Sequence, residues 1–98
     1  IINVGGEKVY PQEIENVILE IDNVAEVMVY GEKNLIIGNI VCTKVRLQKN
    51  ENKKDFTNRL KIYCAEKLKG YKVPVKVQID YEEQYSDRYK KNRSFNVA

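Results

Sequence analysis

The sequence predicts a small α+β domain in two layers: a mixed sheet of about three strands covered by two helices, preceded by an N-terminal hairpin and followed by an extended C-terminal tail. Two stretches have the apolar spacing of amphipathic helices, and three others have the pattern of β-strands. A chain of 98 residues is long enough for one hydrophobic core and too short for two full domains.

The first helix is expected over residues 11–22, after a short hairpin. Two glycines, Gly5 and Gly6, separate two strand-like stretches, which is typical of a tight turn because glycine adopts positive φ without steric cost. Pro11 suits a first helical turn, and four aliphatic residues follow at helical spacing: Ile14, Val17, Ile18 and Ile21. Glu13 and Glu15 near the helix start are explained by the helix dipole alone.

Two strands should follow the first helix. Residues 24–31 form a β-rich run closed by Gly31, and residues 32–39 are expected to be a loop. The next strand alternates, with Val41, Thr43, Val45 and Leu47 on one face and Cys42, Lys44 and Arg46 on the other. The intervening loop is too short for a crossover helix, so the pair should be antiparallel.

The second helix is expected over residues 56–69, with Asp55 as its cap and Gly70 as its end. Its apolar stripe consists of Phe56, Leu60, Tyr63, Cys64 and Leu68. A last half-buried strand alternates strictly, with Val75, Val77, Ile79 and Tyr81 facing inward.

Composition excludes several kinds of site. Cys42 and Cys64 lie in apolar patterns without CxxC spacing and the chain has no histidine, so we expect buried reduced thiols and no metal ligand. The sequence has no long apolar run and no signal-peptide pattern, which favours a cytoplasmic protein that does not span a membrane.

Charge is uneven along the chain although its net value is only +3. Residues 1–49 hold five basic and seven acidic side chains, whereas residues 50–98 hold twelve and seven. The second half should therefore be the part that meets an anion. The basic, aromatic-containing stretch 85–95 leaves open a nucleic-acid-binding module or a plain interaction module, although Asp87 and the lack of a known RNA-binding motif argue against nucleic acid.

Five segments, taken in order, resemble a known family. They are "GGEKVYPQEIENVI", "VAEVMVYGEKN", "GNIVCTKV", "LKGYKVPVKV" and "YSDRYKKNR". Together they resemble the small C-terminal domain of the adenylate-forming superfamily, which includes acyl-CoA synthetases, adenylation domains of nonribosomal peptide synthetases, and luciferase. The chain starts abruptly at Ile1, and the resemblance implies that residues 1–98 are one mobile domain of a larger ligase, whose large N-terminal domain binds ATP and a carboxylic acid.

The resemblance also implies site residues. Lys90 matches the lysine that contacts the carboxylate and the α-phosphate during adenylation, with Ser86 and Arg93 as supporting positions in the tail. Tyr89 stands where the family has glycine, so Lys91 stays open as the alternative lysine.

The loop of Gly5, Gly6 and Glu7 matches the segment that lines the entry of the thiol acceptor. ATP with Mg²⁺, and CoA or the phosphopantetheine arm of a carrier protein, are the implied ligands. Lys69 and Lys72, with Lys76 beside them, could meet either acceptor equally well, although an ordinary solvated basic face is the favoured explanation of these lysines.

Overall fold

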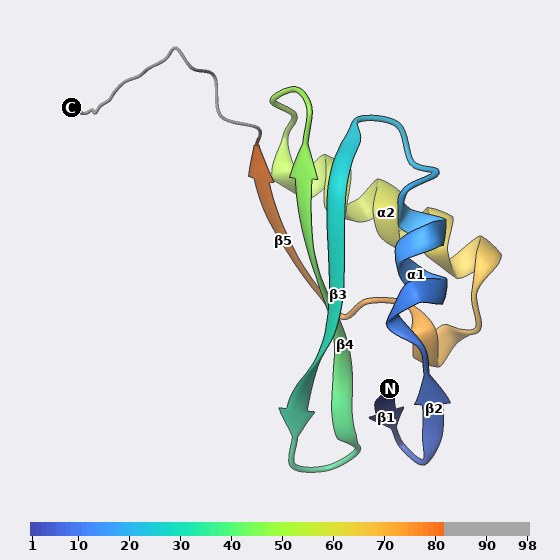
Figure 1. The fold of residues 1–98 in the computed structure, drawn as a ribbon. Helices are drawn as coiled ribbons and strands as arrows, with labels where there is room; N and C mark the ends of the chain where they lie inside the picture. Colours follow the sequence, from blue (N-terminus) through green and yellow to red (C-terminus); the bar gives the residue numbers. More distant parts are fainter. Residues whose placement is uncertain (82–98) are drawn as a thin grey trace.

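The computed structural model describes residues 1–81, which form a two-layer α+β domain (Figure 1). In chain order its strands are β1 (Ile2–Val4), β2 (Glu7–Val9), β3 (Val24–Asn34), β4 (Gly38–Leu47) and β5 (Lys76–Tyr81). The helices are α1 (Pro11–Ile18), α2 (Lys53–Lys67) and a short 3₁₀ helix, η1 (Gly70–Lys72). The predicted class and order of elements are confirmed.

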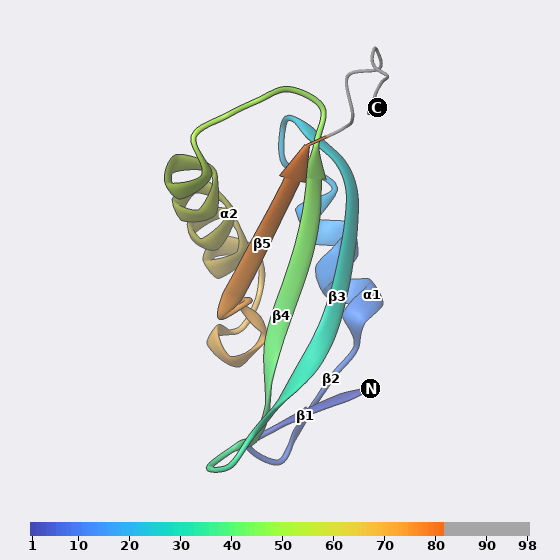
Figure 2. The ribbon, with the colours of Figure 1, turned by 90° about the vertical axis from the view of Figure 1, so that its left-hand side faces the viewer.

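The main sheet is mixed, as the sequence predicts. Strand β4 lies between β3, which is antiparallel to it, and β5, which is parallel to it. The β1–β2 hairpin joins β4 through a single pairing of Val4 with Gly38, which extends the sheet to five strands in the order β2-β1-β4-β3. Strand β5 lies off this path and pairs with β4 over Cys42–Leu47. Figure 2 shows the hairpin crossing the lower end of the two long strands.

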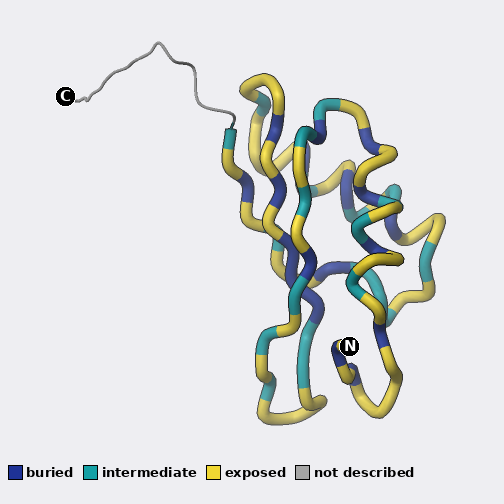
Figure 3. The backbone as a smooth tube through the Cα atoms, viewed as in Figure 1, coloured by how far each residue is buried: buried dark blue, intermediate teal, exposed yellow. Residues whose placement is uncertain are grey.

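Both helices cover the same face of the sheet, and the core lies between the two layers (Figures 1 and 3). Its largest fully buried side chains come from β2, α1, α2 and β4: Val9, Ile14, Ile18, Phe56, Leu60, Val41, Val45 and Leu47. Thr43 is buried among them, and its hydroxyl donates to the carbonyl oxygen of Met28 at 3.1 Å. Its polar group is therefore satisfied.

Helix α1 is shorter than the predicted range of 11–22. It ends at Ile18, and the amides of Glu20 and Ile21 bond three residues back in the tighter pattern of a last turn. Asn23 then takes a φ of 77°, which stops helical continuation. Ile21 is buried as predicted, although it lies past the helix.

Strand β3 does not close at Gly31 but continues to Asn34. A Cβ on Gly31 would lie 2.9 Å from Cγ2 of Ile2, so glycine here makes room for the crossing strand β1. Residues 32–34 and 38–39 therefore belong to strands, and the predicted loop shrinks to residues 35–37.

Helix α2 begins at Lys53 and ends at Lys67, so the predicted range of 56–69 and the cap at Asp55 are wrong. The side chain of Asn52 accepts a hydrogen bond from the backbone N–H of Asp55 at 3.0 Å and caps the helix. Gly70 belongs to η1 rather than ending α2, and Val75, predicted to face inward, is 55% exposed before β5 begins.

Candidate functional site

The Gly5-Gly6 turn closes the β1–β2 hairpin at one end of the domain. Its φ angles are +56° at Gly5 and +89° at Gly6, and positive φ at both central residues is the geometry of a two-residue type I′ hairpin turn. The Oδ1 atom of Asn3 accepts the N–H of Gly6 at 3.1 Å and holds the turn in shape. The predicted hairpin and its need for glycine are confirmed.

Space around the turn is open. A Cβ added at either glycine would meet no atom of residues 1–81 within 4 Å. Glycine is therefore required here by the positive φ angles of the backbone and not by close neighbours within these residues. The space beside the turn is therefore open to groups that lie outside residues 1–81. Glu7 is exposed and begins β2 directly after the turn.

Three contacts attach this hairpin to the turn between β3 and β4. The N–H of Gly5 donates to the carbonyl oxygen of Ile37 at 2.7 Å, and Nδ2 of Asn39 donates to the carbonyl oxygen of Asn3 at 3.1 Å. The pairing of Val4 with Gly38 lies between them. The two turns form one end of the molecule, which is visible in Figures 1 and 2.

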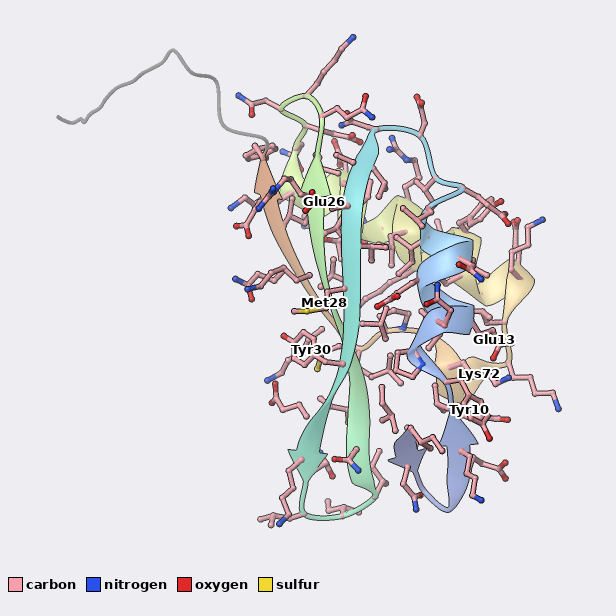
Figure 4. The ribbon with its side chains drawn as sticks, in the orientation of Figure 1. Tyr10, Glu13, Glu26, Met28, Tyr30 and Lys72 are labelled. Carbon is pink, nitrogen blue, oxygen red and sulfur yellow. The ribbon has the colours of Figure 1, made fainter. Side chains whose placement is uncertain are left out.

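Lys72 lies in η1 and is held by α1. Its Nζ atom is 2.9 Å and 3.2 Å from the two carboxylate oxygens of Glu13, and Figure 4 shows the two side chains directed toward one another with Tyr10 nearby. The hydrogen bond that Lys72 donates to Glu13 raises the pKa of Lys72, so its ammonium stays charged. A phosphate could recruit Lys72 only in competition with Glu13.

The other two basic residues are arranged differently. Lys69 is exposed at the residue preceding η1, and no ion pair involves it within residues 1–81. Lys76 begins β5, where its Nζ atom lies 2.6 Å from Oε2 of Glu32. Among the three, Lys69 is therefore the one without an ion pair within residues 1–81.

The sheet face away from the helices carries charged pairs and an open hollow of about 190 Å³, which is lined by Glu26, Val27, Met28, Lys44, Arg46 and Asp80. Glu26, Met28 and Tyr30 of β3 lie on it, as Figure 4 shows. Arg46 pairs with Glu26 at 3.3 Å, and Cys42 lies under the Glu32–Lys76 pair with its thiol 3.8 Å from Glu32. Burial raises the pKa of the Cys42 thiol, which disfavours the thiolate that a nucleophile needs.

Glu15 has a structural role that helix-dipole reasoning does not reveal. Its Oε2 atom accepts the backbone N–H of Val29 at 2.9 Å. Strand β3 is an edge strand, and this contact satisfies one of its outward-facing amides while fixing α1 against it.

The tail residues Ser86, Tyr89, Lys90, Lys91 and Arg93 lie outside the described residues. The described chain ends at Tyr81, at the end of β5 farthest from the Gly5-Gly6 turn (Figure 1). Residues 1–81 contain no cluster of three or more His, Cys, Asp or Glu side chains able to hold a metal ion, and no helix in that range is long and apolar enough to cross a membrane.

Comparison with known proteins gives consistent matches. A 2-succinylbenzoate–CoA ligase of Geobacillus kaustophilus is 37% identical over 73 residues, covering 74% of this chain and 14% of the relative. A 3,4-dihydroxybenzoate–[aryl-carrier protein] ligase of Bacillus anthracis is 33% identical over 78 residues, covering 80% of this chain and 18% of the relative. The chain thus spans less than a fifth of the length of these relatives.

A solved structure of an o-succinylbenzoate CoA synthetase variant from Bacillus subtilis matches with a TM-score of 0.72 and 33% identity, covering 95% of this chain and 17% of that one. The family model of the AMP-binding enzyme C-terminal domain matches residues 13–84. The resemblance drawn from the five sequence segments is therefore confirmed, and the chain belongs to the family of AMP-binding enzyme C-terminal domains.

Proposed function

We propose that this chain is the mobile C-terminal domain of an ATP-dependent acid–thiol ligase. In a first half-reaction the longer enzyme joins a carboxylic acid to the AMP part of ATP and releases pyrophosphate, and in a second it transfers the acyl group to a thiol and releases AMP. Support comes from the family match and from relatives named as CoA ligases and as an aryl-carrier-protein ligase. The ATP and acid pockets are assigned to a large domain outside these 98 residues.

The observation that carries this proposal is that the Gly5-Gly6 turn and the end of β5 at Tyr81 lie at opposite ends of β4. One end of β4, at Gly38, pairs beside the Gly5-Gly6 turn, and the other end, at Leu47, pairs with Tyr81. A strand of this length spans roughly 30 Å. The turn and the point where the chain leads on toward Lys90 therefore lie at opposite ends, and rotation of the domain would present each end in turn to one active site.

Lys90 would act in the adenylation pose, the orientation of the domain in which the tail faces the active site. A carboxylate that attacks an α-phosphate brings two anions together, and an ammonium bridging them positions the nucleophile and offsets their repulsion. Lysine suits this task because it is a compact charge on a flexible stem. Lys91 is the alternative, and Ser86 and Arg93 are proposed to support the tail.

The Gly5-Gly6 turn, with Glu7, would act in the thiol-transfer pose, the orientation in which this turn faces the active site. Bare backbone directed into open space leaves room for a narrow thiol-bearing arm to pass, which side chains at these positions would obstruct. The same turn geometry would serve CoA and the phosphopantetheine arm of a carrier protein.

The acceptor has two candidates. CoA is favoured by the larger number of relatives named as CoA ligases, whereas the Bacillus anthracis relative acts on an aryl-carrier protein. Lys69 is the better placed of the predicted contacts to meet an acceptor phosphate or an acidic carrier surface, because Lys72 is paired with Glu13. Mg²⁺ would be bound by the ATP phosphates and the large domain.

The test separates the two half-reactions in the longer enzyme. We expect ATP–pyrophosphate exchange that depends on a carboxylic acid, and thioester formation when CoA or a phosphopantetheinylated carrier is added. The 98-residue chain alone should catalyse neither. The proposal is falsified if the isolated chain exchanges pyrophosphate, or if the longer enzyme forms no acyl-adenylate with any carboxylic acid.

A further inference from the structure

The turn between β3 and β4 carries an exposed aliphatic tip, defined as Leu35, Ile36 and Ile37. These side chains are 99%, 90% and 41% exposed, respectively. Isolated exposed apolar residues are normal on protein surfaces, but three consecutive ones form a contiguous patch. Turns are usually built from Gly, Pro, Asn, Asp and Ser, so turn formation does not explain aliphatic residues at all three positions.

The tip has a defined shape. The Oδ1 atom of Asn34 accepts the N–H groups of Ile36 and Ile37 at 2.9 Å and 3.2 Å. Asn34 also pairs with Gly38, whose φ of 94° turns the chain back into β4. The aliphatic side chains are therefore presented outward by a hydrogen-bonded turn.

The tip is coupled to the Gly5-Gly6 turn. The carbonyl oxygen of Ile37 accepts the N–H of Gly5, and Asn39 bonds to Asn3 just behind it. These contacts join the two turns within one sheet, so a rotation of the domain that brings the Gly5-Gly6 turn to the surface of another domain also brings the tip there. Figure 3 shows both turns as exposed segments at the same end.

Charge at this end argues for a protein partner. Glu7 and Lys8 follow the glycine turn, and Glu32 and Lys33 precede the tip. Lys76 pairs with Glu32, so the acidic and basic side chains nearly balance, with one basic side chain in excess. An anionic lipid or nucleic-acid surface would select a net positive patch. An apolar tip with nearly balanced charge fits an apolar patch on a folded domain, and the relatives are at least five times longer than the part that this chain matches.

We propose that the Leu35–Ile36–Ile37 tip docks on an apolar patch of the large domain of the same enzyme in the thiol-transfer pose and leaves it in the adenylation pose. This inference rests on the proposed function. The tip would then stabilise one pose selectively, so that thiol transfer depends on aliphatic side chains that contact neither the acid nor the thiol.

The experiment uses the longer enzyme with Leu35→Gln and Ile36→Gln combined. Both side chains are at least 90% exposed within residues 1–81, so the fold should persist. Thioester formation from supplied acyl-adenylate should fall at least about tenfold, because burial of each aliphatic side chain is lost. Acid-dependent pyrophosphate exchange should stay within about twofold of the unsubstituted enzyme.

The matched control is Ile62→Gln, at an aliphatic residue that is 62% exposed on α2. Both half-reactions should be unchanged in this variant. Gly6→Trp, assayed in parallel, distinguishes a failure of the docking inference from a failure of the proposed function on which it rests. If Gly6→Trp blocks thiol transfer and the tip variant does not, the docking inference is wrong and the proposed function stands. If neither variant affects thiol transfer, the docking inference and the role assigned to the glycine turn are both wrong.

A lipid partner is tested directly with vesicles of equal phosphatidylcholine and phosphatidylglycerol. We expect no difference in vesicle binding between the unsubstituted enzyme and the tip variant. Tip-dependent vesicle binding combined with normal thiol transfer would overturn the proposal and assign the tip to a membrane surface.

Discussion

Gly5 donates its backbone N–H to the carbonyl oxygen of Ile37 at 2.7 Å, and this bond joins two turns that are more than thirty residues apart in the sequence. The two turns therefore form one end of the domain. The chain leaves the described structure at the other end, after Tyr81. The predictions below test these two ends and the core that separates them.

Gly6→Trp in the longer enzyme should block thiol transfer and leave acyl-adenylate formation nearly normal. The φ of +89° strains any L-residue here, so Gly6→Ala serves as a control that shares the strain without the bulk. The measurements are pyrophosphate exchange and thioester formation for each variant. Equal loss in both half-reactions, or an alanine variant as inactive as the tryptophan variant, would assign the effect to the turn itself.

Lys90→Ala in the longer enzyme should slow acyl-adenylate formation about a hundredfold or more, as expected for loss of a preorganised charge contact. Thioester formation from supplied acyl-adenylate should survive. Lys91→Ala is the internal control and should have little effect. An exchange of the two phenotypes would move the active lysine to Lys91, and normal adenylation in both would exclude the tail from this step.

Asn52→Ala should lower the free energy of unfolding of the 98-residue chain by about 1 kcal/mol, because the cap on the N–H of Asp55 is lost. Asp55→Ala should cost about half as much, since only a favourable charge near the helix start is removed. Urea unfolding measures both. A larger effect at Asp55 than at Asn52 would contradict the observed cap.

Stability should fall above pH 9 in a way that depends on Cys64. Burial raises the pKa of the Cys64 thiol from 9.0 to about 11, so the unfolded chain loses this proton at lower pH than the folded domain does. The contribution of the protonated Cys64 thiol to the free energy of unfolding is therefore complete below pH 9 and is lost as the pH rises toward 11.

The measurement is urea unfolding of the chain and of Cys64→Ala between pH 8 and 11. One proton contributes a slope of about 1.4 kcal/mol per pH unit, and the variant should lack this part of the slope. Tyr63 and Cys42, whose pKa values are also raised, remain in both proteins. Identical slopes for the two proteins would contradict the assignment to Cys64.

Local patterns in the sequence predicted most of the architecture. The helical stripe of Phe56, Leu60 and Cys64 and the alternation of Val41, Thr43, Val45 and Leu47 identify the buried faces, because side-chain periodicity follows from backbone geometry. The element boundaries were less accurate. Asn52 and Asp55 both suit a cap, and only the folded backbone decides which side chain reaches the unpaired amide.

The sequence by itself determined the α+β class, the order of helices and strands, the glycine turn and the family, since each depends on residue type and spacing along the chain. Only the tertiary structure decided that Gly31 makes room for Ile2, that Lys72 is held by Glu13, and that Gly5 bonds to Ile37 beside an exposed aliphatic tip. Each of these contacts joins residues at least twenty-nine positions apart, and such pairs are fixed by how the layers pack rather than by any local preference.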